Sequence, residues 1–554
     1  MVGQRHHIQF RRDCGGDHFG GALGAVGAVG VGVEIDAHCT IVSGGLGFSL
    51  PDVVPLAEPP AAVLGKEWEN GAMSEDDATK RRAQRTNTPE FIEYMTTGWQ
   101  REEEPIPAAS SVAPFAAQRR TTLAEQFPRE ILVFPAGPAK VRSNDTDYRF
   151  RAHSAFAHLT GLGGEREPRA VLVLAGTEHT LYLQPMADRT SAEFFSSAAT
   201  GEFWIGPKPT LAHVAAELDL AVSPLLALKP LLLAEAQQGS AIRAISGIDP
   251  EIDALLAEIR PGGAASDQEL EQAASELRLV KDEWEVSQMR AAVAATHEGF
   301  NRVLRSLPQA KAHHRGERVV ETEFFTAART EGNGLGYDTI AASGDHATIL
   351  HWISNDGPVR SGDLLLLDAG VEMDSLYTAD ITRTVPVDGT FSPVQRQVYQ
   401  AVLDAADAGF AAARPGNRFR DVHAAAMAVI AERLSQWGVL PVSVEESLTV
   451  TFHHRRWMVH GTSHHLGLDV HDCAQARNEL YMDGILEPGM VFTIEPGLYF
   501  KSDDALVPAE FRGIGVRIED DVLITADGVE NLSAALPRKA DEVEAWVQHH
   551  LAGN

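Results

Sequence analysis

Cysteine is scarce in this chain: three of its 554 residues are cysteines, at positions 14, 39 and 473. The third is far from the other two, so they indicate neither a disulfide framework nor a zinc finger, and they suit a reducing compartment. Apolar runs of the ~18 residues that a membrane helix needs are also missing. The nearest run, residues 19–33, is rich in glycine and alanine and only weakly hydrophobic. We therefore expect a cytoplasmic protein with no membrane partner.

Positive charge is in short supply as well. The sequence has 47 Lys and Arg against 77 Asp and Glu, a formal net charge of −30. Nucleic-acid phosphates would be repelled across most of such a surface, which argues against a nucleic-acid partner. Hydrophobic residues at 44% and charged residues at 22% are typical of a globular protein. The length predicts two domains and an extension.

Composition divides the chain into three parts. Residues 1–72 are of low complexity and show no sustained helical or strand period, so we expect a disordered or mis-assigned extension. Met73 begins a sequence typical of a cytosolic N-terminus, and we hypothesise that the native protein starts there. An N-terminal domain is then expected over residues 73–265 and a catalytic domain over residues 266–554.

Short apolar runs at residues 131–134, 170–175 and 179–184 predict strands, and helical stretches lie between them. The fold class is therefore α/β (α+β). The segment PGGAAS, residues 261–266, reads as a linker. A helix is expected after it, because residues 286–300 carry an apolar stripe with a 3.6-residue period.

A pair of acids marks the segment 364–387. Two β-prone runs flank a turn near residues 373–375, which predicts an antiparallel hairpin. Asp368 and Asp380 lie six residues on either side of Asp374, so they are expected to be cross-strand neighbours about 5 Å apart. Two carboxylates in an apolar strand pair are unfavourable unless a positive charge lies between them. A metal cation would supply it.

Two further acids occupy apolar strands near the C-terminus. Glu495 is expected at the end of the strand in MVFTIEPGLYF, and Glu519 within the strand in GIGVRIEDDVLIT, beside Arg517. Asp520 and Asp521 are interpreted as the polar end of that strand. Four acids so placed supply enough negative charge for two divalent ions.

Histidines cluster in HGTSHHLGLDVHD, residues 460–472. A histidine in such a segment is more often structural than a ligand, but a borderline metal held by acids usually takes one imidazole. Four carboxylates with one histidine form an oxygen-rich site. This donor set favours Mn²⁺, with Co²⁺, Fe²⁺ or Zn²⁺ as alternatives.

These segments, together with LDAG, TADITRT, EPGMVFTIEPG and RGIGVRIEDD, resemble the aminopeptidase P and prolidase group of pita-bread metallopeptidases. The resemblance spans roughly residues 110–550 and implies a creatinase-like N-terminal domain followed by a pita-bread catalytic domain. It implies a two-metal site whose ligands match the following residues: Asp368, Asp380, His464, Glu495 and Glu519. Within it, Asp380 and Glu519 would bridge the two ions.

The same resemblance implies roles for further residues. His351 matches the histidine that contacts the substrate near the scissile bond, and His460 and His471 match the other two active-site histidines. All three are expected to donate hydrogen bonds to the peptide oxygen, and Glu495 matches the residue that transfers a proton. Tyr337, Tyr499 and Arg517 match residues that support the acids or line the pocket. The implied reaction is removal of the first residue from peptides with proline second, by a hydroxide shared between the metals. Arg477 is a candidate entrance residue, and a homodimer or homotetramer is expected.

Several alternatives remain open from the sequence. Prolidase, which cuts only Xaa-Pro dipeptides, shares the ligand set and is the nearest. Methionine aminopeptidase lacks an N-terminal domain of this size, and creatinase lacks the ligands. A non-catalytic pita-bread module that binds histones or RNA is also conceivable, although such modules usually lose ligands. The native metal and the preferred first residue are not determined by these motifs.

Overall fold

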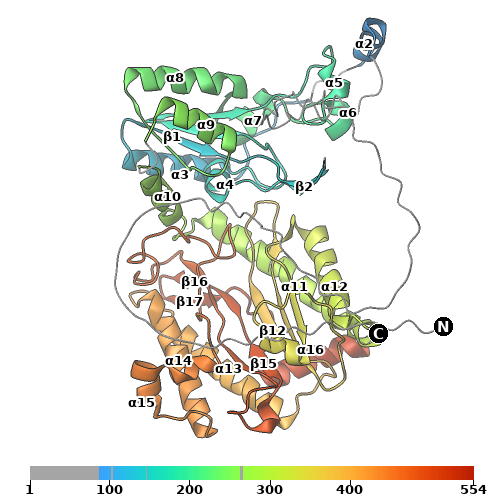
Figure 1. Cartoon of the computed structure of the whole chain (residues 1–554), viewed down its shortest axis with the longest axis vertical. Helices are drawn as coiled ribbons and strands as arrows, with labels where there is room; N and C mark the ends of the chain where they lie inside the picture. The colour runs from blue at the N-terminus through green and yellow to red at the C-terminus, as the bar shows by residue number, and fades with distance from the viewer. Residues whose placement is uncertain (1–86, 101–103, 145, 263–265, 554) are drawn as a thin grey trace, which may run out of the picture. The chain divides into compact units, whose positions relative to one another are not determined.

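The structure is a computed structural model that describes residues 87–100, 104–144, 146–262 and 266–553 (Figure 1). A five-stranded sheet organises its first part. The three predicted strands are present as β1 (Glu130–Pro135), β4 (Val171–Ala175) and β5 (Glu178–Leu183). With β6 (Ala221–Pro224) and β7 (Ala241–Ala244) they form a sheet in the order β6-β5-β4-β1-β7. The predictions for residues 1–72, including the start at Met73, lie outside the described residues.

Both faces of this sheet are buried. Leu132 and Phe134 of β1 pack into one apolar cluster, whereas Ile131 and Val133 pack into another. Successive strand residues point to opposite faces, so two covered faces require an unbroken apolar run. This explains why the run ILVF does not alternate with polar residues. The helices of this region and its remaining strands are α2 (Pro89–Thr96), α3 (Ala113–Gln126), β2 (Val141–Ser143), β3 (Thr146–Asp147), α4 (Ser154–Thr160), α5 (Glu193–Ser196), α6 (Glu202–Ile205), α7 (Leu211–Leu218), α8 (Leu228–Gln238) and α9 (Pro250–Ile259).

The helix predicted after the linker is present as α11 (Glu283–Ala312), preceded by α10 (Asp267–Glu276). Asp282 caps α11: its carboxylate accepts a hydrogen bond from the amide of Glu285 at 3.0 Å. The Glu285 side chain accepts one in return from the amide of Asp282 at 2.9 Å. Such a capping box satisfies two free amides and stabilises the helix start by about 1 kcal/mol.

In the second part of the structure, helices surround several small antiparallel sheets. Its three-stranded sheets have the orders β12-β10-β9 and β13-β16-β17, and β14 pairs with β15. The elements of this part after α11 are α12 (Gly316–Glu331), β8 (Gly334–Leu335), β9 (Ile340–Ser343), β10 (Leu364–Ala369), β11 (Val371–Glu372), β12 (Ile381–Pro386), α13 (Pro393–Ala412), α14 (Phe419–Gln436), α15 (Val444–Glu446), β13 (Val491–Ile494), β14 (Gly497–Phe500), β15 (Ile514–Arg517), β16 (Asp520–Thr525), β17 (Gly528–Asn531) and α16 (Ala540–Ala552).

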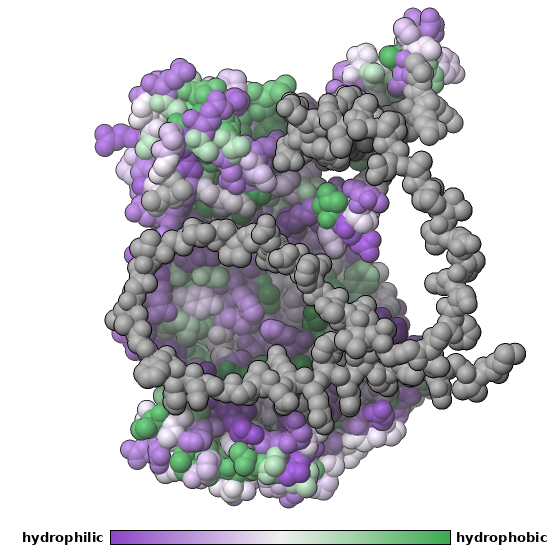
Figure 2. Space-filling view, in the orientation of Figure 1, coloured by the Kyte–Doolittle hydropathy of each residue, from purple (hydrophilic) through white to green (hydrophobic). Residues whose placement is uncertain are grey.

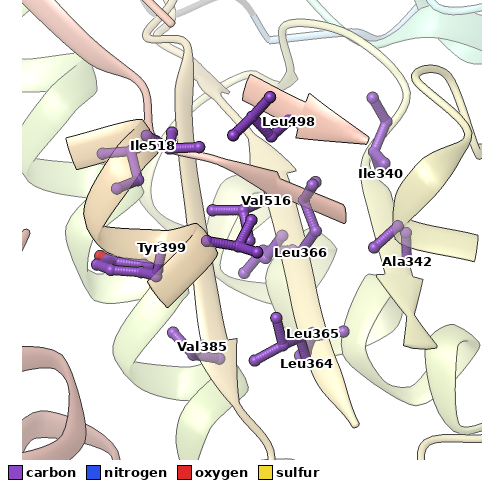
Figure 3. Packing of buried hydrophobic residues seen from close by; sticks show 14 of the residues in the cluster. Ile340, Ala342, Leu364, Leu365, Leu366, Val385, Tyr399, Leu498, Val516 and Ile518 are labelled. Carbon is purple, nitrogen blue, oxygen red and sulfur yellow. The ribbon is translucent and has the colours of Figure 1, made fainter. Parts of the chain in front are cut away.

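The leucines of β10 lie in the largest apolar cluster (Figure 3). Leu365 and Leu366 are at most 1% exposed and pack with Val385 of β12 and Val516 of β15. Burying each such leucine contributes roughly 1.5–3 kcal/mol. This packing holds β10 firmly, so Asp368 near its end is carried on a rigid strand.

Polar contacts join the two parts. The guanidinium of Arg119 in α3 donates to the Asp282 carboxylate at 2.9 Å. Arg151 donates to Glu372 of β11 at 2.7 Å and also to the carbonyl of Leu468. These contacts attach the N-terminal region to the start of α11 and to the histidine-rich loop.

His153 lies beside these contacts, and its Nδ1 atom has no hydrogen-bond partner among the described residues. Burial, followed by the charge of Arg278, lowers the pKa of His153 from 6.5 to about 4. Between these two pH values the unfolded chain binds a proton that the folded chain does not, so folding stability falls as the pH falls.

His153→Asn should therefore weaken the pH dependence of stability. From pH 7 to pH 4 we expect the unfolding free energy of the wild type to fall about 2–3 kcal/mol more than that of the variant. Denaturant titrations of both proteins at the two pH values measure this difference. Equal losses in the two proteins would show that His153 does not carry the effect.

On the face shown in Figure 2, hydrophilic (purple) residues predominate over the described surface and hydrophobic (green) residues are interspersed. Among the described helices, none combines the length and the apolar character needed to cross a bilayer.

Candidate metal centre

The predicted hairpin is present, with a different register. β10 and β12 pair antiparallel with Asp368 opposite Thr382, not opposite Asp380. The expectation that Asp368 and Asp380 are direct cross-strand neighbours is therefore wrong. The turn is centred on Ser375, because Glu372 pairs with Thr378. Because the centre of the turn is shifted by one residue, the residue opposite Asp368 is shifted by two, from Asp380 to Thr382.

Tyr337 nevertheless joins the two acids. Its hydroxyl lies 2.6 Å from Oδ1 of Asp368 and within hydrogen-bonding distance of Oδ1 of Asp380. Arg517 donates to Oδ2 of Asp368 from the other side. The two carboxylates are 7% and 5% exposed, so both are held in a nearly dry environment.

His464 reaches the same place from the histidine-rich loop. Its Nε2 lies 3.3 Å from Oδ2 of Asp380 and 3.5 Å from Oε1 of Glu495. Its Nδ1 lies 3.3 Å from the carbonyl oxygen of His465. A proton on Nδ1 donated to that carbonyl leaves the Nε2 lone pair directed at the acids, the arrangement found in metal-bound histidines.

Glu495 follows β13, as predicted, and its amide donates to the carbonyl of Thr462 at 2.8 Å. Glu519 lies in the break between β15 and β16, not within one strand as expected. Thr382 fixes Glu519 twice: the threonine hydroxyl donates to Oε2 at 2.6 Å, and the threonine carbonyl accepts from the glutamate amide at 3.0 Å. Sequence reasoning missed this role of Thr382, although the residue stands in the motif TADITRT.

The charges of this cluster are unbalanced. Burial and the neighbouring acids, first Asp380 and then Glu495, raise the pKa of Glu519 well above its usual value. Burial likewise raises the pKa of Glu495 to about 7. Burial disfavours the charged form of His464, but Asp380 and Glu495 outweigh it and raise the pKa of the imidazole to about 9. Protons are retained because three buried carboxylates and the partly buried one of Glu495 face one guanidinium and one imidazole.

A divalent metal fits this donor set. Asp380, His464 and Glu519 offer ligand atoms that all lie within 4.8 Å of one another. Asp368 and Glu495 do not belong to that tight group, but both line the same cavity. Cations between these side chains would balance the charge that the protein leaves uncompensated, and four carboxylates with one imidazole suit borderline divalent ions.

The cavity above the acids has a volume of about 570 Å³, within the usual range for small-ligand sites. Eight of the predicted site residues outside the tight group lie around it. His351, His460, His471, Tyr337, Asp368, Glu495 and Arg517 line it, and Tyr499 lies behind this lining, where its hydroxyl accepts a hydrogen bond from Arg517 at 3.1 Å and lies 2.8 Å from Nε2 of His460. Ile340, Ser463, Val470 and Tyr481, which the sequence did not single out, line it too.

The interpretation of Asp520 and Asp521 as a polar strand end is wrong, because neither is exposed. Asp520 forms a buried ion pair with Arg383 at 2.6 Å. Asp521 accepts hydrogen bonds from the amide of Asp380 at 3.2 and 3.3 Å and so orients a site residue. Alternation along β16 could not reveal this, because both faces of the strand are covered.

Three further histidines and Arg477 have no part in the metal cluster. His465 is fully buried and stacks on Phe419 at 4.7 Å, which agrees with a packing function. His454 is buried, whereas His453 is exposed. Arg477 pairs with Glu276 at 2.6 Å.

Models of two known domains match the chain. Residues 287–526 match metallopeptidase family M24, and residues 116–240 match the N-terminal domain of aminopeptidase P. Xaa-Pro aminopeptidase 1 of Streptomyces coelicolor is 49% identical over 466 residues, covering 83% of this chain and 92% of that protein. The Xaa-Pro aminopeptidase of Escherichia coli is 34% identical, covering 77% and 96%.

Solved structures of bacterial aminopeptidases match the fold of this chain as well. Zinc-substituted E. coli aminopeptidase P in complex with product matches with a TM-score of 0.69 and 31% identity, covering 80% of this chain and 99% of that one. Aminopeptidase PepP of Pseudomonas aeruginosa gives a TM-score of 0.68 at 30% identity. The predicted architecture, an aminopeptidase P-type N-terminal domain followed by an α/β metallopeptidase domain, is confirmed. From the paired domains, the extent of these similarities and the acid–histidine cluster, the chain belongs to the aminopeptidase P family of M24 metallopeptidases.

Proposed function

We infer that this enzyme removes the N-terminal residue from peptides whose second residue is proline, in a metal-dependent hydrolysis. The observation that carries the inference is that Asp380, His464 and Glu519 bring their ligand atoms together at the wall of one cavity. The relatives at 48–49% identity are Xaa-Pro aminopeptidases, which favours this activity over the dipeptidase alternative. A non-catalytic module is disfavoured because the five candidate ligands are intact.

We assign the metal ligands as Asp368, Asp380, His464, Glu495 and Glu519, and Mn²⁺ as the preferred ion, with Co²⁺, Fe²⁺ and Zn²⁺ as alternatives. Held there, two such ions would supply Lewis acidity and would lower the pKa of a water molecule. Asp380, His464 and Glu519 would form the centre of this set, since their ligand atoms lie within 4.8 Å of one another.

Other side chains in the cavity have proton and binding roles in the proposal. Glu495, which the family resemblance assigns to proton transfer, accepts a proton from the attacking water at its carboxylate and passes it to the leaving amide nitrogen. His351 and His471 donate hydrogen bonds to the substrate oxygen, which contribute roughly 3–4 kcal/mol per well-placed donor.

His460 acts differently, because both its ring nitrogens are engaged. Nδ1 lies 2.6 Å from the carbonyl of Gly461, and Nε2 lies 2.8 Å from the hydroxyl of Tyr499. We assign His460 to the wall that contacts the proline ring, Tyr499 to the support of His460 from behind, and Tyr337 and Arg517 to support of the acids. A proline residue suits such a wall because its ring is rigid and because its amide nitrogen carries no hydrogen that would need a partner there.

A peptide-length assay tests the function. Manganese-loaded protein should release the first residue from an Xaa-Pro-Xaa tripeptide, measured by chromatography of the products, and should leave Xaa-Ala-Xaa intact. Cleavage of the Xaa-Pro dipeptide alone would establish prolidase activity instead. No cleavage, with no stoichiometric metal in the purified protein, would favour the binding module.

The domain limits at residues 72 and 265, the cytoplasmic location and the homodimeric or homotetrameric assembly stay predictions. Size-exclusion chromatography with light scattering measures the assembly directly.

A further inference from the structure

Glu317 is a buried acid outside the metal centre. It lies in the first turn of α12, which runs beside α11 (Figure 1), and it is 0% exposed. An isolated buried carboxylate costs several kcal/mol unless donors satisfy its oxygens. Its partners therefore indicate what it does.

Four donors meet this one carboxylate. Oε1 accepts hydrogen bonds from the amide of Ser343 at 2.9 Å and from Nδ1 of His346 at 2.7 Å. Oε2 accepts from Nε1 of Trp352 at 2.9 Å and from the amide of Gly357 at 2.6 Å. A carboxylate offers about four acceptor positions, so its capacity is fully used.

All four donors belong to one stretch, residues 343–357, which we call the His351 segment. The donors lie at its two ends and on both sides of His351. The imidazole of His346 also stacks on the indole of Trp352 at 3.8 Å between ring centroids. Glu317 thus ties together both ends of the segment whose middle, Leu350, His351 and Ile353, lines the reaction cavity.

Space around this junction is tight. A Cβ atom added at Gly357 would lie 2.6 Å from His346 and 2.7 Å from Glu317. Asn355 provides a second anchor: its side chain accepts from the amide of Ala341 at 3.0 Å and donates to the carbonyl of Thr339 at 2.8 Å. His351 itself makes no side-chain hydrogen bond within the described residues, so its position depends on this backbone.

We propose that Glu317 is a positioning residue that holds His351 at the reaction cavity through the His351 segment. This inference rests on the proposed function. Charge-assisted hydrogen bonds to a carboxylate are about twice as strong as neutral ones, which suits a residue that must keep a loop in one arrangement. Glu317 touches neither substrate nor metal in this proposal, and it acts only through the loop.

Glu317→Gln tests the proposal with little change in volume. The amide group of glutamine replaces one acceptor oxygen by a donor. In either orientation this donor meets a main-chain amide, that of Ser343 or that of Gly357, and loosens one end of the segment. We expect kcat/KM for an Xaa-Pro-Xaa peptide to fall 10- to 100-fold, mainly through kcat, because a displacement of about 1 Å costs up to ~10²-fold. Bound manganese should be unchanged.

Glu323→Gln is the matched control. Glu323 lies on the same helix, and its ion pair with Arg302 at 2.7 Å is at the surface. This variant should keep the wild-type kcat and KM. Trp352→Phe is the milder second variant: it removes one donor to Glu317 and retains an aromatic ring over His346. A smaller loss in the same direction is expected, and it serves if Glu317→Gln does not fold.

A double-mutant cycle with His351→Ala separates positioning from a general structural role. If Glu317 acts through His351, the Glu317→Gln or Trp352→Phe change should alter kcat/KM less than about twofold once His351 is alanine. An equal loss in both backgrounds, or no loss in the wild-type background, would overturn the proposal. Inactive wild-type protein on every Xaa-Pro peptide would instead refute the proposed function, and this inference with it.

Discussion

Asp380→Asn is expected to lower kcat/KM by at least about 10³-fold and to remove most of the bound metal. The Asp380 carboxylate faces both His464 and Tyr337. One of its oxygens lies within 4.8 Å of a ring nitrogen of His464 and of a carboxylate oxygen of Glu519. Asparagine keeps the size of the side chain and the amide contact to Asp521, so the fold should survive. The lost charge removes one of the ligands that would hold the metal, and with the metal the activation of water that it would supply. Kinetics on Xaa-Pro-Xaa and elemental analysis of the purified variant measure both effects.

Asp388→Asn is the control for this substitution. Asp380 directly precedes β12, and Asp388 lies just after it. Asp388 is exposed and pairs with Lys311 at 2.9 Å. Exposed ion pairs contribute ~1 kcal/mol or less, so activity and metal content should be those of the wild type. If Asp380→Asn retains full metal and activity, the assignment of Asp380 as a ligand is wrong.

Removing the metal should abolish activity and lower stability. Three buried carboxylates and the partly buried one of Glu495 then face only Arg517 and His464, and the excess negative charge must be relieved by protonation or local opening. Manganese at 100–1,000 times its dissociation constant should raise the unfolding free energy by about 3–4 kcal/mol, because it binds the folded chain. Chelator-treated protein, with and without added Mn²⁺, is compared by denaturant unfolding and by peptide cleavage.

Two features make this experiment decisive. The gain in stability should be absent from Asp380→Asn, which cannot hold the ions, and present in Asp388→Asn. Magnesium at the same concentration should restore less activity, since an imidazole ligand favours Mn²⁺ and its neighbours over harder ions. Identical unfolding curves with and without manganese would mean that this cluster does not bind it.

Part of the candidate site was accessible from local patterns. Asp368, Glu495 and Glu519 interrupt or end apolar runs, and a charged residue in such a run needs a chemical reason. The apolar runs of β1, β4 and β5 and the helical period of α11 likewise depend on residues close in sequence, so the α/β class could be predicted. The two domains were predicted by resemblance, and the family comparisons confirm them.

Other features depended on contacts between distant segments. The hairpin was expected to be symmetric about Asp374, but its centre is Ser375, because strand register is set by which side chains the covering elements bury. Asp520 and Asp521 looked like a solvated strand end, yet Arg383 and the amide of Asp380 are their partners more than 130 positions away.

The amino-acid order of this protein determined which chemical groups are available, the local elements that carry them and the two-domain plan. The groups and the local elements follow from the side-chain period and from the cost of placing charge in an apolar run, which act over a few neighbouring residues. The two-domain plan follows from the chain length and from the family resemblance. Tertiary structure alone decided the register between Asp368 and Asp380, the threonine that fixes Glu519, and the role of Glu317 under the His351 segment. Each of these results from burial and hydrogen bonding between segments that meet only when the chain is folded.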